Sequence, residues 1–93
     1  MDVRTLVGLN LRRLRVSKGM SQQALALMCK FEPSYVGRIE RGTGNVTVVT
    51  LDKLAEAIGS PVAAFFEQPS EGAPKPVKLA PGRKPRARDP RLP

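Results

Sequence analysis

The predicted fold is decided by residues 21–42, which read SQQALALMCKFEPSYVGRIERG. Ser21 is a good N-cap for a helix over about 22–29, and Pro33 suits the first turn of a second helix over about 33–41. Only about three or four residues separate the two, a spacing at which short helices pack at a steep angle. The pattern therefore predicts a pair of helices joined by a tight turn.

The second helix of this pair has two chemically different sides. On a wheel at about 100° per residue, one side carries two apolar residues and a carboxylate, and the other side is polar and cationic. The first set is Val36, Ile39 and Glu40, and the second is Ser34, Gly37, Arg38 and Arg41. Such a helix can anchor on its apolar side while its polar N-terminal turns enter a DNA major groove about 12 Å wide.

The polar side offers candidates for contact with base edges. Arg38 is the best candidate for direct readout, because a guanidinium can bond to O6 and N7 of guanine; the alternative is a solvated surface arginine. Ser34 can contact a base or a phosphate. Pro33 and Tyr35 can touch a thymine methyl group or pack along the sugar-phosphate chain, but helix initiation and half-buried packing explain them equally well.

Two features link the first helix of the pair to the second. Gly37 is less favourable than Ala in a helix by about 1 kcal/mol, which suggests that either the first helix or DNA comes close to its backbone. Gln22 and Gln23 stand at the N-terminus of the first helix, where unpaired N–H groups and the positive end of the helix dipole suit a phosphate. The Gln22 amide can also brace a side chain of the second helix.

Three further helices complete an all-α unit. The first spans about 2–18 and stops at Gly19, another spans about 48–58 with Thr47 as its N-cap, and Ser60-Pro61 opens a short fifth helix. Apolar residues at helical spacing predict the core. They are Val3, Val7, Leu11 and Leu14, then Leu25, Ala26 and Cys29, then Val36 and Ile39, and then Val48, Leu51, Leu54, Ala55 and Ile58. Val62, Phe65 and Phe66 of the fifth helix either close this core or supply apolar side chains for a dimer interface.

The composition narrows the classes of function. Sixteen Lys and Arg residues against eight Asp and Glu residues give a net charge of +8, which favours polyanions such as nucleic acid or an anionic membrane face. The chain has no His and one Cys, so a His/Cys zinc site, a Ser-His-Asp triad and an internal disulfide are excluded, and no cofactor is expected. No apolar run has the length of a signal peptide or a membrane span, so we expect a cytoplasmic protein without a membrane partner.

The composition changes after Gln68. Seven of the nine prolines and seven of the sixteen basic residues lie beyond it, with only two acidic residues. We therefore expect a folded domain over 2–68 and a disordered, Pro-rich basic tail over 69–93. Residues 81–88, PGRKPRAR, faintly resemble an AT-hook of the narrow minor groove, although a phosphate-binding or solubilising tail is the simpler interpretation, and a protein partner stays open.

Several motifs follow one another along the chain: LRRLR at 11–15, GMSQQALA at 19–26, YVGRIERG at 35–42, and the segment 47–59. Together they resemble the lambda-repressor-like, or Xre-type, helix-turn-helix family over about residues 3–66. The resemblance implies a five-helix DNA-binding domain of a transcriptional regulator, whose relatives usually bind palindromic operators as dimers. The short length and residues 35–45 look most like restriction-modification controller proteins, which implies a homodimer built partly from the fifth helix.

Carried over position by position, the resemblance implies a set of contacts. Gln22 would contact the phosphate backbone, and the base-facing surface would be formed by Glu32, Pro33, Ser34, Gly37 and Arg38. Arg41, Thr43 and Asn45 would flank the DNA backbone. An ion pair of Arg15 with Glu40 would lock the first helix over the motif, and breaking such a buried pair costs about 3–5 kcal/mol. The chain departs from the family at Lys30, where the turn often has Gly, and at Glu32 and Pro33, which replace the more usual uncharged polar residues. Glu32 either caps the third helix or accepts from cytosine N4.

Three other classes of function compete with a DNA-binding regulator. An antitoxin or another protein-interaction module is the strongest rival, with the tail as its binding segment. RNA binding is weaker, because the four aromatic residues mostly look like core and leave no stacking platform. An enzyme is not expected, since no paired carboxylates, nucleophile and base, or phosphate-cradling glycine loop stands out. The sequence thus predicts a regulator that binds double-stranded DNA.

Overall fold

The structure is a computed structural model that describes residues 1–69. This part contains no strand and four α-helices, which are α1 (Val3–Ser17), α2 (Gln22–Cys29), α3 (Pro33–Glu40) and α4 (Val48–Ile58). A 3₁₀-helix, η1 (Val62–Phe66), follows them. The predicted tail over 69–93 lies, from residue 70 on, outside the described residues. Within residues 1–69, no helix combines the length and the apolar character needed to cross a membrane.

Side-chain caps set where three of the helices begin. Oxygens of Asp2, Ser21 and Thr47 accept hydrogen bonds from the N–H groups three residues ahead, at 2.9, 2.9 and 3.0 Å. Each bond satisfies one of the N–H groups that the first turn of a helix leaves unpaired. Ser21 and Thr47 stand where the sequence predicted N-caps, and Asp2 is a further one.

The core forms between the apolar sides of all five elements. Its largest fully enclosed side chains are Leu11, Leu25, Val36, Ile39, Leu54 and Phe65. Two predicted core residues are wrong, because Val3 is 58 % exposed and Val48 is 79 % exposed. Each is the first residue of its helix. Helical spacing alone therefore extends the predicted stripe one turn too far.

The expected fifth α-helix is wrong, since η1 is a 3₁₀ segment. Its backbone bonds run from i to i+3, as from the Ala64 N–H to the Pro61 carbonyl at 3.0 Å, and the backbone becomes extended at Glu67. Phe65 is fully buried, whereas Phe66 is 42 % exposed. Asn10 anchors the segment to α1, because its buried amide donates to the carbonyls of Phe65 and Glu67, both at 2.8 Å.

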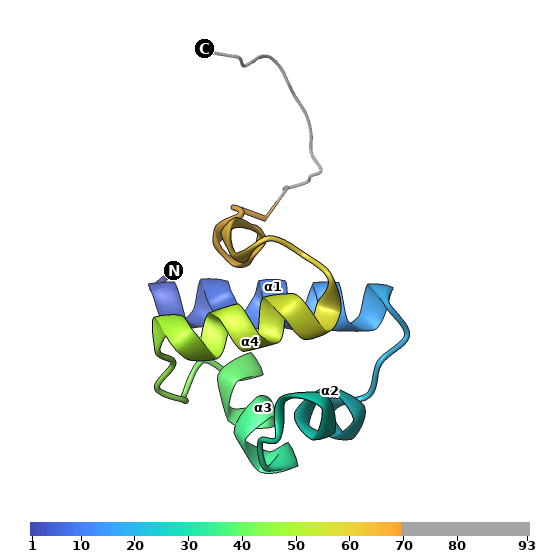
Figure 1. The fold of residues 1–93 in the computed structure, drawn as a ribbon. Helices are drawn as coiled ribbons and strands as arrows, with labels where there is room; N and C mark the ends of the chain where they lie inside the picture. Colours follow the sequence, from blue (N-terminus) through green and yellow to red (C-terminus); the bar gives the residue numbers. More distant parts are fainter. Residues whose placement is uncertain (70–93) are drawn as a thin grey trace.

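α1 lies between η1 and α3 and packs against both (Figure 1). Its contact with α3 is close: a Cβ added to Gly8 would lie 2.4 Å from the carbonyl oxygen of Ile39 and 2.7 Å from that of Glu40. α2 packs against α3 and α4. The pair of α2 and α3 therefore sits on the side of the molecule away from η1 (Figure 1).

Candidate nucleic-acid interface

α2 and α3 are joined by a turn of three residues, 30–32. Lys30 ends α2 in the left-handed conformation, with φ 61° and ψ 39°, and no other non-glycine residue in the described part has a positive φ. The Phe31 N–H then donates back to the Ala26 carbonyl at 2.8 Å, which satisfies an otherwise unpaired acceptor at the end of α2. Lys30 therefore forms the same tight turn that glycine would form, but its side chain makes the left-handed conformation energetically costly.

Glu32 occupies the N-cap position of α3, but its side chain makes no capping hydrogen bond. The interpretation of Glu32 as a side-chain cap is therefore wrong. Glutamate is longer than the Ser, Thr, Asp and Asn side chains that reach the helix N–H groups from this position. Pro33 fills the first helical position, where no N–H donor is needed, so α3 begins without such a cap.

The two sides of α3 differ in exposure. Val36 and Ile39 are 0 % and 1 % exposed, whereas Ser34 and Arg38 on the other side are exposed. A helix of eight residues is too short to be stable by itself, so the buried pair holds it in place. The polar side is thereby left free to meet a ligand.

A buried ion pair fixes the C-terminal end of α3 to α1. Arg15 donates through Nε to Glu40 Oε2 at 2.6 Å and through Nη2 to Oε1 at 3.0 Å, and the two side chains are 12 % and 5 % exposed. Its Nη1 donates to the Met20 carbonyl at 2.8 Å. The hydrogen bond with Glu40 raises the pKa of the Arg15 guanidinium above its usual value. Gln22 Nε2 donates to Glu40 Oε1 at 3.0 Å, so one carboxylate joins α1, α2 and α3.

Gly37 is covered by side chains of the protein itself. A Cβ added there would lie 3.2 Å from Arg41 Nη1 and 3.5 Å from Gln22 Oε1. The sequence suggested that either α2 or DNA comes close to the backbone at Gly37. In the structure α2 does so through Gln22, and the end of the Arg41 side chain lies there as well. The Gln22 amide spans the space between α2 and α3, with its nitrogen toward Glu40 and its oxygen toward Gly37.

The exposed side of α3 has its own internal contacts. The Arg38 guanidinium carbon lies 5.5 Å from the centre of the Tyr35 ring, and its Nη1 lies 3.5 Å from Ser34 Oγ. The Tyr35 hydroxyl donates to the Asn45 carbonyl at 2.7 Å. The Thr43 N–H donates to the Arg38 carbonyl at 3.0 Å. α3 and the loop after it thus form one connected surface.

Most of the predicted contact residues are accessible on or beside this surface. The exposed ones are Gln23, Glu32, Pro33, Ser34, Arg38, Arg41, Thr43 and Asn45, while Gln22 and Tyr35 are half-buried and Gly37 is buried. Gln23, Glu32 and Pro33 take no part in the side-chain contacts above; they stand at the start of α2, just before α3 and at the first position of α3. The other predicted residues are brought together around α3 and its loop.

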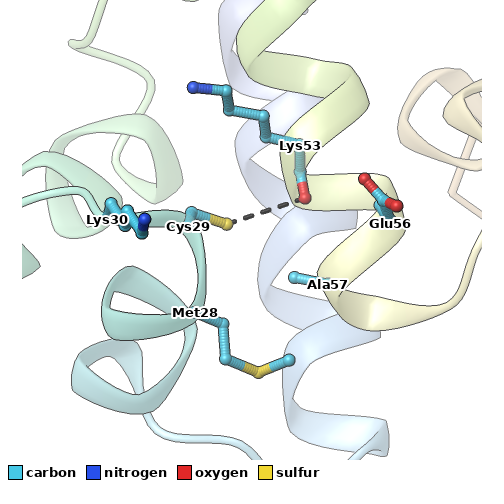
Figure 2. A pocket seen from close by; sticks show the side chains of 6 residues that line it. All are labelled: Met28, Cys29, Lys30, Lys53, Glu56 and Ala57. Atoms are coloured by element: carbon cyan, nitrogen blue, oxygen red, sulfur yellow. Dashed lines mark hydrogen bonds between the residues drawn. The ribbon is translucent and has the colours of Figure 1, made fainter.

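Sequence reasoning missed Lys53 of α4, whose Nζ lies 5.8 Å from the centre of the Phe31 ring in the turn. Figure 2 shows the hollow beside this turn, where side chains of α2 and α4 face each other. The Cys29 thiol donates to the Lys53 carbonyl at 3.6 Å, and burial raises the pKa of that thiol. Cys29 is therefore protonated at neutral pH and joins α2 to α4. Nothing in the local sequence marks Lys53, since its partner lies in another element.

Known proteins share this arrangement. A family model described as helix-turn-helix matches residues 11–65, which contain α2, α3 and α4 in full. An uncharacterized HTH-type transcriptional regulator, y4dJ, of Sinorhizobium fredii is 46 % identical over 59 residues, covering 63 % of this chain and 77 % of that protein. Control protein C.BamHI of Bacillus amyloliquefaciens is 41 % identical over 59 residues, covering 62 % of this chain and 73 % of that protein. The crystal structure of the restriction-modification controller protein C.AhdI from Aeromonas hydrophila aligns with a TM-score of 0.66 and 41 % identity, over 68 % of this chain and 96 % of that one.

Proposed function

This chain belongs to the helix-turn-helix family and is a DNA-binding transcriptional regulator, and we propose that it reads double-stranded DNA with the exposed side of α3 in a major groove. The observation that carries the proposal is the separation of the two sides of α3, because Val36 and Ile39 are enclosed while Arg38 is free to reach outward. The relatives are named as transcriptional regulators and control proteins, which favours this function over that of a protein-interaction module.

Within this interface, different segments of the protein contact the bases and the phosphates. The exposed side of α3 meets the base edges, where Arg38 donates to guanine O6 and N7. The residues around Arg38 on this surface are Glu32, Pro33, Ser34, Tyr35 and Gly37. Phosphates are met by the start of α2 and by the end of α3 with its loop, through Gln22, Gln23, Arg41, Thr43 and Asn45. The division is supported by the exposure of these segments and by the contacts that tie the loop to α3.

Selection of bound duplexes from a random DNA pool tests this function. We expect one enriched motif made of two inverted half-sites about 34 Å apart, the separation of one helical turn. Binding to this motif should weaken as salt rises, because Lys and Arg side chains release counterions from the phosphates. A pool in which no motif is enriched would rule out sequence-specific recognition.

We further propose that the protein acts as a homodimer. One module of this size buries only about 600–1,000 Å² on DNA, so two half-sites are the usual route to useful specificity. Exposed apolar side chains are available for self-association, since Val3, Val48 and Phe66 line one groove where the starts of α1 and α4 meet the end of η1. Phe65, by contrast, closes the core of a single subunit.

Sedimentation at micromolar concentration tests the dimer and its surface. The unmodified protein should sediment as a dimer, and Val48→Glu should sediment as a monomer because a charge then stands on the apolar face. Leu27→Glu is the matched control, since Leu27 on α2 is exposed to the same extent, 79 %, away from that groove. If the unmodified protein were a monomer, or if both variants behaved alike, this surface would not be the interface.

We propose residues 2–68 as the DNA-binding domain, in a protein that works in the cytoplasm, where it meets its operator. The net charge of this part is +3, from nine basic and six acidic residues, and the segment 69–93 adds seven basic residues. Its removal should reduce the slope of log affinity against log salt by about 0.9 for every phosphate that the segment neutralises. An unchanged slope would mean that the segment stays off DNA.

A further inference from the structure

We infer that Tyr35 is a positioning residue for Arg38, and that its ring is a fixed platform holding the guanidinium in the direction needed to read a base. The inference rests on the proposed function, because it concerns how the same surface obtains its base preference. The contacts that carry it run from the turn before α3, along the exposed side of the helix, to the loop after it.

The Tyr35 ring is held from three directions. Phe31 in the turn meets it edge to face, with ring centres 5.3 Å apart and an angle of 86° between the planes. The Tyr35 hydroxyl donates to the Asn45 carbonyl at 2.7 Å. The backbone of Tyr35 belongs to α3, which its buried neighbour Val36 fixes in the core. A ring tied in this way cannot swing freely, so a group stacked on it takes a defined position.

Arg38 is that stacked group. Its guanidinium carbon is 5.5 Å from the ring centre, inside the range of about 6 Å at which a cation is attracted to the electron-rich face of an aromatic ring. Its Nη1 also lies 3.5 Å from Ser34 Oγ, one turn earlier on the helix. A long side chain loses rotamer freedom when it binds a base, and one that is already oriented loses less of it. The stacked position therefore favours binding through the guanidinium.

The same contacts keep the loop after α3 in register with the base-reading side chain. The Arg38 carbonyl accepts hydrogen bonds from the N–H groups of Thr43 at 3.0 Å and Gly44 at 3.2 Å. The Tyr35 hydroxyl holds the next residue of the loop, Asn45. The loop is thus tied both to the backbone of Arg38 and to the platform beneath its side chain. The loop, which is proposed to contact phosphates, is therefore held in a fixed position relative to Arg38, which is proposed to contact a base.

The experiment uses the full-length protein and the motif selected from random DNA. Arg38→Ala first identifies the base pair that Arg38 reads, as the pair at which preference for one base disappears. Tyr35→Phe is compared with a variant carrying pentafluorophenylalanine at position 35, because this residue keeps the shape of the ring and makes its face electron-poor. Tyr35→Leu, which removes the ring, is an independent variant if the fluorinated protein does not fold.

We expect Tyr35→Phe, which loses one of the three ties but keeps the ring and its electron-rich face, to retain more of the base preference at that pair than the fluorinated and leucine variants do. The fluorinated and leucine variants should lower the preference about two- to fivefold, the range of an exposed cation–π contact, at that pair alone. When Arg38→Ala is already present, they should lower it no further. If Tyr35 had only a structural role, its variants would lower the preference in the Arg38→Ala protein as well.

The inference is overturned if the ring-face variants keep the unmodified preference, or if they reduce preference equally at every pair. It is also overturned if a motif is selected but Arg38→Ala changes no base preference. If the unmodified protein selects no motif, the proposed function itself fails, so the two failures are distinguishable.

Discussion

On its inner side, α3 is fixed by Val36, Ile39 and Glu40, whose contacts reach α1, α2 and the core. On its outer side, Arg38 contacts Ser34 and the Tyr35 ring, and Tyr35, which also packs against the edge of the core, contacts the turn before α3 and the loop after it. The inner contacts give a helix of eight residues the stability that it lacks alone, whereas the outer contacts orient Arg38 and tie the loop to α3. Substitutions on the two sides should therefore have separable effects, on stability inside and on base preference outside.

The largest effect is expected from the ion pair on the inner side. Glu40→Ala leaves the charge of Arg15 in a site where that side chain is only 12 % exposed. The free energy of unfolding, measured in urea, should fall by about 3–5 kcal/mol. The double variant Arg15→Met with Glu40→Leu should lose much less, because apolar side chains replace the pair and no charge is stranded. Equal losses in the single and double variants would mean that the charges are not what holds α3.

Replacement by alanine should have opposite effects on stability at two helical glycines, Gly8 of α1 and Gly37 of α3. In Gly8→Ala the new methyl group would lie 2.4 Å from the Ile39 carbonyl oxygen, so α1 and α3 must move apart, at a cost of about 3 kcal/mol. In Gly37→Ala the nearest groups are the flexible ends of Arg41 and Gln22, so stability should hold or rise by up to about 1 kcal/mol. Urea unfolding of both variants measures the contrast, which disappears if they are equally destabilised.

Local signals in the sequence were enough to predict the four α-helices and the two sides of α3. Ser21 caps α2 where expected, and the helical wheel separates Val36 and Ile39 from Arg38 as the structure does. Local signals did not predict the pairing of Arg15 with Glu40, because the two residues are 25 positions apart in the sequence. Only the family resemblance suggested this pair. Spacing along one helix reports which side a residue faces, but it does not name its partner.

Contacts between distant segments escaped prediction. Asn10 binds carbonyls 55 and 57 residues away, and the need for glycine at position 8 depends on how closely α3 approaches. The hydrogen bond between Tyr35 and Asn45 likewise depends on the path of the loop. η1 has the apolar spacing of a helix but forms a short 3₁₀ segment. These features exist only once the elements are placed in space, so no local pattern reports them.

On the outer side, Arg38→Ala should leave the free energy of unfolding nearly unchanged and weaken discrimination at one base pair by about 1–3 kcal/mol. Competition among duplexes that differ at a single pair measures this loss. Arg12→Ala is the matched control, because it removes an equal charge from an exposed position on α1. The control should keep the base preference; a similar loss in both variants would point to net charge as the cause.

The smallest effect is expected in the turn that joins α2 to α3. Lys30 holds φ 61° and ψ 39°, a conformation that glycine adopts without steric penalty. Lys30→Gly should therefore raise the free energy of unfolding by about 0.5–1 kcal/mol, the relief of left-handed strain less the freedom that glycine gains in the unfolded chain. Lys30→Ala removes the same side chain but keeps the strain, so it should not stabilise the protein. If the two variants were equally stable in urea, the lysine side chain, and not the backbone conformation, would set the stability of the turn.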